Sequence, residues 1–185
     1  MQKNLTCPLC NGKFPVYANP SPTTDVIVHA PGRGVVIIAR ANIPLGYAIP
    51  GGFIDEGEWV EDAAIREMKE ETNLDVVLDG LLGVYSRPDR DPRHHTMTTV
   101  FVGHPVDPDA LRAGDDAGAA AWYDPHYPPQ PMCFDHGVVL ADFCDYLEGR
   151  RQLGGLSREW LDTVAGHRNV LRAGLAAIAA EGKGR

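Results

Sequence analysis

The sequence predicts an α/β fold, because short apolar, β-branched runs alternate with helical segments. Residues 25–30 and 35–40 have the composition of strands and are joined by a Pro-Gly-Arg-Gly hairpin turn. Residues 60–72 contain helix formers throughout, without Gly or Pro, which predicts a helix. Further strands follow, and a second helix is expected over 135–148, capped by its first residue.

The composition indicates one globular domain with small additions, since the chain has 185 residues and 44% of them are hydrophobic. The net charge of −8 argues against nucleic-acid binding, which needs a basic surface. A bound cation would still permit a polyanionic substrate. No apolar run is long enough to span a bilayer, and residues 1–10 do not resemble a signal peptide. We therefore expect a cytoplasmic protein that binds neither nucleic acid nor membrane.

Three regions are expected along the chain. Residues 1–23 form a short segment with a Cys-x-x-Cys motif and an extended connector, and residues 24–149 form the main domain. Residues 150–185 contain a linker and an amphipathic helix, with apolar residues at helical spacing from Trp160 to Ile178. We expect this helix to pack on the domain or on the second subunit of a homodimer.

The Cys-x-x-Cys motif at Cys7 and Cys10 resembles one knuckle of a zinc ribbon. A closed structural Zn²⁺ site takes four ligands, and no second such motif follows. Cys133 and Cys144 are far away in sequence and are expected to be small buried residues. Two interpretations therefore stay open for the motif, a Zn²⁺ site or a tight turn without metal.

Three carboxylates are expected on one face of the helix at 60–72. Glu67, Glu70 and Glu71 are spaced i, i+3, i+4. Like charges at this spacing destabilise a helix, so a bound divalent cation is the expected compensation. Mg²⁺ and Mn²⁺ prefer oxygen ligands and keep water or substrate phosphate in their other positions. The alternative, a solvated acidic face, leaves unexplained the Pro-Gly-Gly before the helix and the arginine at Arg66.

The stretch 51–74 resembles the Nudix box. That pattern has a Gly, five residues, a Glu, seven residues, and then Arg-Glu-apolar-any-Glu-Glu-any-Gly-apolar. The matching residues are Gly52, Glu58, Arg66, Glu67, Met68, Glu70, Glu71 and Leu74. Asn73 stands where the pattern has Gly, and Asn also suits the left-handed conformation of a helix end. The resemblance implies a Nudix α/β/α sandwich around a mixed sheet.

The same resemblance implies metal-dependent hydrolysis of a nucleoside diphosphate linked to another group. The implied Mg²⁺ or Mn²⁺ ligands are three carboxylates and one backbone carbonyl: Glu67, Glu70, Glu71 and Gly51. Glu58 and Arg66 are expected to support these ligands. Glu70 or Glu71 is also a candidate to accept the proton of the attacking water.

A cationic loop at 86–95 is the main candidate for substrate contact beyond the box. It contains Arg87, Arg90 and Arg93, and guanidinium groups match the geometry of phosphate. Its Arg-Asp-Pro-Arg segment is similar to the ADP-ribose pyrophosphatase branch of Nudix proteins, in which this loop lies near the substrate. The alternative is a solvated loop whose Arg and Asp side chains pair with each other.

Two further residues are open to two interpretations each. Arg40 ends the strand at 35–40 and either faces the substrate pocket or is a plain edge-strand charge. Phe53 either stacks on the base of a nucleotide or is a rim aromatic. Many relatives carry a further carboxylate where this chain has residues 118–120, so Asp115 or Asp116 is a substitute, or the box acts alone.

The expected substrate is ADP-ribose, which would give AMP and ribose 5-phosphate. One alternative is a pyrophosphatase for (d)NTPs or oxidised nucleotides, and another is an NADH pyrophosphatase, which the half ribbon suggests. From a different class, some Nudix domains sense ADP-ribose without hydrolysing it. That interpretation predicts a DNA-binding appendage and often a decayed box, and the sequence shows neither.

Overall fold

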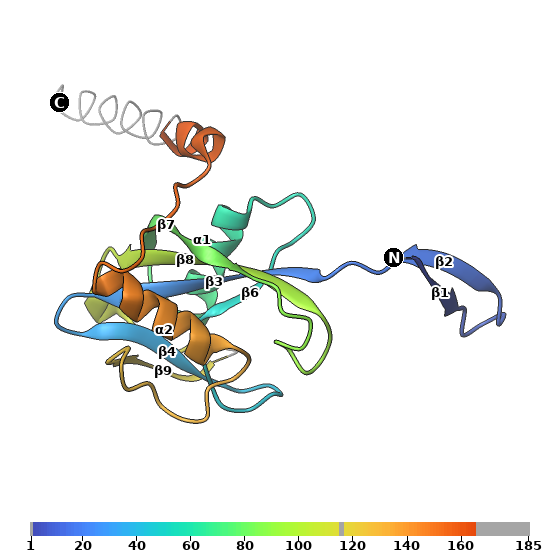
Figure 1. Cartoon of the computed structure of the whole chain (residues 1–185), viewed down its shortest axis with the longest axis horizontal. Coiled ribbons are helices and arrows are strands. Elements are labelled where there is room, and N and C mark those ends of the chain that lie inside the picture. The colour runs from blue at the N-terminus through green and yellow to red at the C-terminus, as the bar shows by residue number, and fades with distance from the viewer. Residues whose placement is uncertain (1, 115–116, 166–185) are drawn as a thin grey trace, which may run out of the picture.

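The computed structural model describes residues 2–114 and 117–165 (Figure 1). A two-stranded sheet is formed by β1 (Gln2–Thr6) and β2 (Lys13–Tyr17). The strands of a seven-stranded sheet are β3 (Ser21–Ala30), β4 (Gly34–Arg40), β5 (Tyr47–Ala48), β6 (Gly51–Phe53), β7 (Val76–Tyr85), β8 (Thr96–Pro105) and β9 (Ala117–Tyr123). The helical elements are α1 (Val60–Thr72), the 3₁₀ turn η1 (Pro108–Ala110) and α2 (His136–Leu147), and residues 158–165 are also helical.

The larger sheet is mixed and is organised around β3. Along one edge β3 runs parallel to β8, which pairs antiparallel with β7. Along the other edge it changes partner, pairing antiparallel with β6 at residues 23–25 and with β4 at residues 29–30. β5 and β9 both pair antiparallel with β4. This confirms the mixed α/β fold, and the change of partner along β3 leaves a gap in the ladder.

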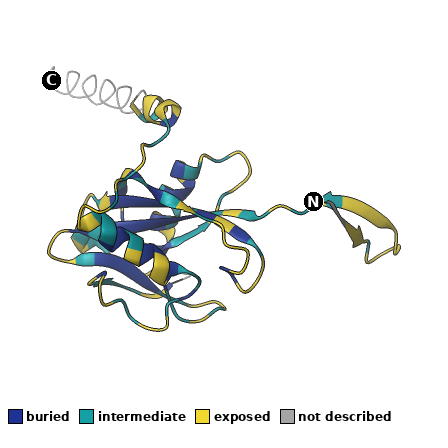
Figure 2. Cartoon of the chain, in the orientation of Figure 1, coloured by how far each residue is buried: buried dark blue, intermediate teal, exposed yellow. Residues whose placement is uncertain are grey.

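Two apolar clusters lie on the two faces of the sheet, one under each helix (Figures 1 and 2). Val26 and Val28 of β3 pack with Ala64 and Met68 of α1. Ile27 points the other way and packs with α2 residues that include Phe143. The alternation follows from the two-residue repeat of a strand, and it explains why both helices are held by the same strand.

The helix α1 has the predicted limits and ends. Trp59 is the N-cap residue and makes no side-chain cap, as its chemistry predicts. Asn73 closes the helix in the left-handed conformation, with φ of 58°, and its amide donates to the Lys69 carbonyl. The acidic face of the helix is therefore fixed at both ends by local sequence.

Several strands differ from the prediction. β3 begins at Ser21 rather than at Asp25, because the extended connector pairs with β8. The segment 76–85 is one strand with two register shifts, and the glycines Gly80 and Gly83 lie at these shifts. Residues 43–52, which contain three glycines and two prolines, nevertheless contribute β5 and most of β6.

The helix α2 is not capped as predicted. Asp135 is its N-cap residue, but its carboxylate makes no capping hydrogen bond. Both carboxylate oxygens instead accept hydrogen bonds from the Arg90 guanidinium. Asp135 is therefore the N-cap residue by position, as predicted, but the Arg90 guanidinium takes both of its oxygens and the side-chain cap is not made. Cys133 and Cys144 are buried, as predicted.

The N-terminal end of the described chain stands away from the larger sheet, whereas the C-terminal end packs on it. The β1–β2 hairpin, which the sequence did not predict, projects away from the larger sheet (Figure 1). Trp160 packs into the cluster under α1, and its Nε1 donates a 2.9 Å hydrogen bond to Asp62. The later positions of the predicted C-terminal helix lie outside the described residues.

Across the described ranges, no helix is both long enough and apolar enough to cross a membrane.

Candidate active site

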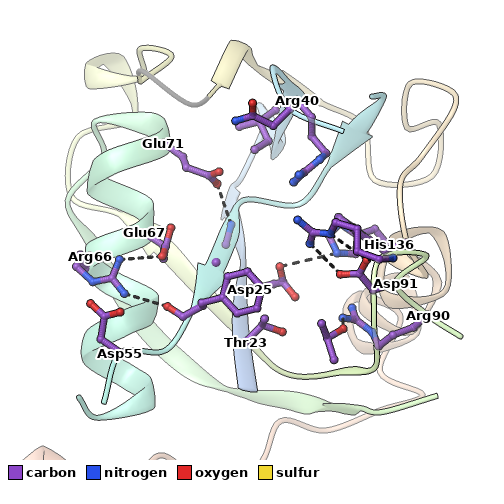
Figure 3. Close-up of a pocket in the computed structure, with 18 residues that line it drawn as sticks. Thr23, Asp25, Arg40, Asp55, Arg66, Glu67, Glu71, Arg90, Asp91 and His136 are labelled. Carbon is purple, nitrogen blue, oxygen red and sulfur yellow. Dashed lines mark hydrogen bonds and ion pairs between the residues drawn. The ribbon is translucent and has the colours of Figure 1, made fainter. Parts of the chain in front are cut away.

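A polar cavity of about 320 Å³ lies beside the gap where β3 passes from β6 to β4 (Figure 3). Side chains reach it from α1, from β3, from the loop before β8 and from the start of α2. The labelled lining residues are Thr23, Asp25, Arg40, Asp55, Arg66, Glu67, Glu71, Arg90, Asp91 and His136. Glu67 and Glu71 of α1 therefore line one side of the cavity with Arg66, and Arg40, Arg90 and Asp91 lie on the other side (Figure 3).

Glu71 is the most buried glutamate of the predicted acidic face. It is 8% exposed, and its Oε2 accepts a 2.9 Å hydrogen bond from the Gly51 amide. Burial, with repulsion from Glu67 and Asp25, raises the pKa of Glu71 to about 8, although the Gly51 amide and Arg40 oppose the shift. The anionic form is therefore disfavoured until a further positive charge arrives.

Glu67 faces the same cavity, and Gly52 makes room for it. A Cβ atom at Gly52 would lie 2.3 Å from Glu67 Oε1, so no other residue fits there without displacing the carboxylate. Burial raises the pKa of Glu67, while a 2.8 Å hydrogen bond from Arg66 lowers it. The glycine of the box thus creates the space for one of its acids.

Arg66 connects α1 to the strand β6. Its Nε and Nη2 each donate a 2.9 Å hydrogen bond to Glu58, and its Nη2 also donates to the Phe53 carbonyl at 3.1 Å. The Arg66 guanidinium lowers the pKa of Glu58. With its contact to Glu67, this arginine holds the acidic helix against β6 and is not free to bind substrate.

Glu70 does not line the main cavity. Its side chain is 60% exposed and lies 3.4 Å from Arg66 Nη1. Glu67, Glu70 and Glu71 together line a second hollow of about 550 Å³ on the other side of the acidic face. Glu67 and Glu71 therefore line the main cavity, whereas Glu70 lies outside it at the exposed edge of the acidic face.

These residues fit Mg²⁺ or Mn²⁺ as an open site rather than a closed one. Within residues 2–114 and 117–165, no three His, Cys, Asp or Glu side chains converge to hold a metal. Mg²⁺ in phosphate-binding sites needs only one or two carboxylates, because water and phosphate oxygens complete its octahedron. Two partly buried acids with raised pKa values, Glu67 and Glu71, match that requirement. Asp115 and Asp116, the proposed substitutes for a further carboxylate, lie outside the described residues.

Arginines and aromatic rings form the facing wall. The Arg93 guanidinium lies 6.0 Å from the Phe53 ring and 5.4 Å from the Phe134 ring, and that of Arg40 lies 5.0 Å from Phe134. Asp91 holds Arg93 through two hydrogen bonds of 3.0 and 2.8 Å. Of the two interpretations of Arg40, the structure supports the one in which it faces the pocket.

The other two arginines of the loop differ from Arg93. Arg87 is exposed, pairs with Asp89 and does not line the cavity. Arg90 lies in the cavity wall, but its side chain is only 3% exposed and donates to Asp135 and to Thr96. The hydrogen bonds of Arg90 hold the loop against α2. Neither Arg87 nor Arg90 therefore has a free guanidinium in the cavity for substrate, although both were predicted to contact it.

Sequence reasoning missed a buried polar pair at the back of the cavity. Asp25 accepts a 2.5 Å hydrogen bond from Thr98 and lies 3.8 Å from His136 Nε2. The His136 Nδ1 accepts from the Ile49 amide at 2.9 Å, and burial lowers the pKa of this histidine. A charged residue at the start of an apolar strand was a signal for Asp25, whereas nothing local marks His136.

Comparisons with known proteins agree with this geometry. A family model described as NUDIX domain matches residues 19–143. The chain is 40% identical over 139 residues to an ADP-ribose pyrophosphatase of Methanocaldococcus jannaschii, which covers 74% of this chain and 80% of that protein. It is 27% identical over 146 residues to the NAD-capped RNA hydrolase NudC of Pseudomonas aeruginosa, covering 75% of this chain and 49% of NudC.

Solved structures show the same architecture. A MutT/nudix family protein from Enterococcus faecalis superposes with a TM-score of 0.62 at 26% identity, covering 74% of this chain and 66% of that one. The NUDIX domain of Shewanella oneidensis NrtR, solved with ADP ribose, has a TM-score of 0.59 at 21% identity, covers 71% of this chain and 90% of that one, and supports the fold alone. The acidic helix α1, the strand β6 with its two glycines, and these matches together show that the chain belongs to the Nudix hydrolase family.

Proposed function

We propose that this chain hydrolyses ADP-ribose to AMP and ribose 5-phosphate in a reaction that depends on Mg²⁺ or Mn²⁺. The observation that carries the proposal is the opposition of charges across one cavity, with Glu67 and Glu71 on one wall and Arg40 and Arg93 on the other. A diphosphate fits this arrangement, because a cation on the acidic wall and guanidinium groups on the facing wall neutralise it from both sides. The relationship to an ADP-ribose pyrophosphatase supports the choice of substrate.

Each part of the site has a role in this proposal. Glu67, Glu71 and the Gly51 carbonyl would hold the Mg²⁺ ion, which would neutralise phosphate oxygens and lower the pKa of the attacking water. Arg66 keeps the Glu67 carboxylate in position through its 2.8 Å hydrogen bond. Glu70 lines the second hollow together with Glu67 and Glu71 rather than the main cavity, so in this proposal it accepts the proton of a water that lies between these carboxylates.

The aromatic rings provide the selectivity for a nucleotide. Phe53 is 42% exposed and Phe134 lies beside Arg40 and Arg93, so both rings border the cationic wall. A base that stacks there leaves its diphosphate beside the arginines. The Asp91–Arg93 pair fixes the position of one guanidinium before substrate arrives, which reduces the entropy lost on binding.

A substrate comparison tests the proposal directly. We expect ADP-ribose with Mg²⁺ to be cleaved with a kcat/KM about tenfold or more above that for NADH and for oxidised deoxynucleoside triphosphates, with AMP identified by chromatography. A preference for triphosphates or for NADH would reject ADP-ribose as the substrate. Tight binding of ADP-ribose without turnover would instead identify a sensor.

Substitution of the acids tests the site. Glu67→Gln and Glu71→Gln keep the side-chain shape but remove the charge, so we expect kcat to fall by roughly 10²-fold or more. Glu70→Gln should lower kcat without changing Mg²⁺ binding measured by calorimetry. The control is Glu56→Gln, an exposed acid outside the cavity, which should keep normal activity. Equal activity of all four variants would place the reaction elsewhere.

A further inference from the structure

The N-terminal hairpin carries two thiols in its turn. Cys7 and Cys10 lie between β1 and β2, where the Cys7 amide donates to Gly12 O and the Asn11 amide donates to Cys7 O, both at 2.9 Å. Asn11 takes the left-handed conformation, with φ of 56°, which lets the turn close tightly. The turn therefore places both thiols at the same end of the hairpin.

The thiols lack further ligands within the described chain. Thiolate Zn²⁺ sites take four ligands in a tetrahedron. The sequence has four cysteines, and the other two, Cys133 and Cys144, are 7% and 9% exposed in the main domain. In the part of the chain that the structure describes, no third His, Cys, Asp or Glu side chain joins the pair. Cys7 and Cys10 thus form half of a site.

One face of the hairpin is apolar and uncovered. Leu5 pairs directly with Phe14 across the two strands, and these side chains are 50% and 46% exposed. Leu9, in the turn between the thiols, is 94% exposed. The hairpin stands apart from the larger sheet, so the domain does not cover this face (Figure 1). A lone two-stranded hairpin is marginally stable in water, and small folds of this size need a metal or a partner.

The charges of the hairpin suit pairing with an identical hairpin. Among residues 2–17, the charged residues are Lys3 and Lys13, and no acid is present. A Zn²⁺ ion with four thiolates carries a net charge of about −2. Two copies supply four lysines, which more than offset that charge. Self-association around the metal therefore places an anionic centre among cationic hairpins.

We propose that Cys7 and Cys10 from two copies of this chain bind one Zn²⁺ ion, and that the apolar faces of the two hairpins pack against each other around it. Binding replaces the thiol protons with four Zn–S bonds and releases these protons to solvent. The partner is a second copy rather than another protein, because one more hairpin provides both the missing ligands and the missing apolar cover. This site is independent of the proposed hydrolysis.

Metal content and mass of the full chain, purified under reducing conditions with Zn²⁺, test the proposal. We expect one Zn²⁺ per two chains by elemental analysis, and a mass in native mass spectrometry of two chains plus one Zn²⁺. A strong chelator should remove the metal and halve the mass while the circular dichroism of the domain stays the same. Co²⁺ in place of Zn²⁺ should give the absorption of a tetrahedral thiolate site.

Three variants separate the site from other causes of association. Cys7→Ser should lose both the metal and the chelator-dependent mass change, and Phe14→Ser should weaken the dimer while the four ligands remain. Cys144→Ala, at a buried cysteine outside the hairpin, should keep both properties. One Zn²⁺ per monomer, no Zn²⁺ above the Cys7→Ser level, or a mass that does not change on chelation would each overturn the proposal, and none of these results bears on hydrolysis of ADP-ribose.

Discussion

The Glu71 carboxylate accepts a 2.9 Å hydrogen bond from the amide of Gly51, a residue 20 positions earlier in the chain. This contact joins the acidic helix α1 to the start of β6, as the hydrogen bond from Arg66 to the Phe53 carbonyl does at the end of the strand. Burial and the acidic neighbours of Glu71 disfavour the ionised form of this carboxylate. Ionised Glu71 therefore destabilises the folded protein, and a bound cation would offset this repulsion.

Metal-free protein should lose stability as pH rises from about 4.5 to about 8. The pKa of Glu71 is raised from 4.5 to about 8 on folding, so in this range the folded chain keeps a proton that the unfolded chain has released. Glu71→Gln cannot ionise and should remove most of this decline, which amounts to a few kcal/mol at most, at about 1.4 kcal/mol per pKa unit. The raised pKa of Glu67 accounts for the remainder. Urea unfolding with a chelator at several pH values measures the effect.

The comparison variant for this experiment is Glu70→Gln. Its side chain is 60% exposed, so its pH profile should run parallel to that of the unchanged protein. Added Mg²⁺ should reduce the decline in the unchanged protein and have less effect on Glu71→Gln. Identical profiles for Glu71→Gln and the unchanged protein would show that Glu71 is not titrating in this range.

Gly52→Ala should inactivate the enzyme with a smaller effect on the fold. The new Cβ would lie 2.3 Å from Glu67 Oε1, so the carboxylate must leave its position beside Arg66. We expect kcat to fall by roughly 10²-fold, as when a metal-supporting group is misplaced. Gly137→Ala is the matched control, because a Cβ there has open space and α2 gains helix propensity. Normal turnover by Gly52→Ala would mean that the Glu67 position does not matter.

Removing Arg90 should destabilise the protein, whereas removing Arg87 should not. The Arg90 side chain is 3% exposed and its loss leaves Asp135 as a buried, unpaired charge, which typically costs about 3–5 kcal/mol. Arg87 is 64% exposed, and such surface pairs contribute about 1 kcal/mol or less. Thermal unfolding of Arg90→Ala and Arg87→Ala measures the contrast, and Asp135→Asn provides a milder variant if Arg90→Ala does not fold.

Arg93→Lys should weaken substrate binding more than it slows the chemical step. Lysine keeps the charge but loses the paired hydrogen bonds to Asp91 and the planar contact with Phe53 and Phe134. We expect KM for ADP-ribose to rise about tenfold while kcat changes little, which steady-state kinetics resolves. A fall in kcat with unchanged KM would assign Arg93 to the reacting phosphates instead.

Features encoded locally were predictable from the sequence. The limits of α1 and the left-handed Asn73 follow from residues next to each other in the chain. The roles of Asp135 and His136 do not, because their partners Arg90 and Ile49 are 45 and 87 positions away. The sequence marked all three loop arginines as equal candidates, and only the folded chain distinguishes the arginine in the cavity from the buried and the exposed one.

The alternation of side chains along β3 offers a way to alter one layer of the protein at a time. Val26 and Ile27 are adjacent and both buried, yet one packs with the helix that carries the acids and the other with α2. Trimming Val26 to alanine loosens the support of the acidic helix, while trimming Ile27 to valine loosens the opposite layer. Substitutions at two neighbouring positions can therefore change the rigidity of the layer that carries the acidic helix separately from that of the opposite layer.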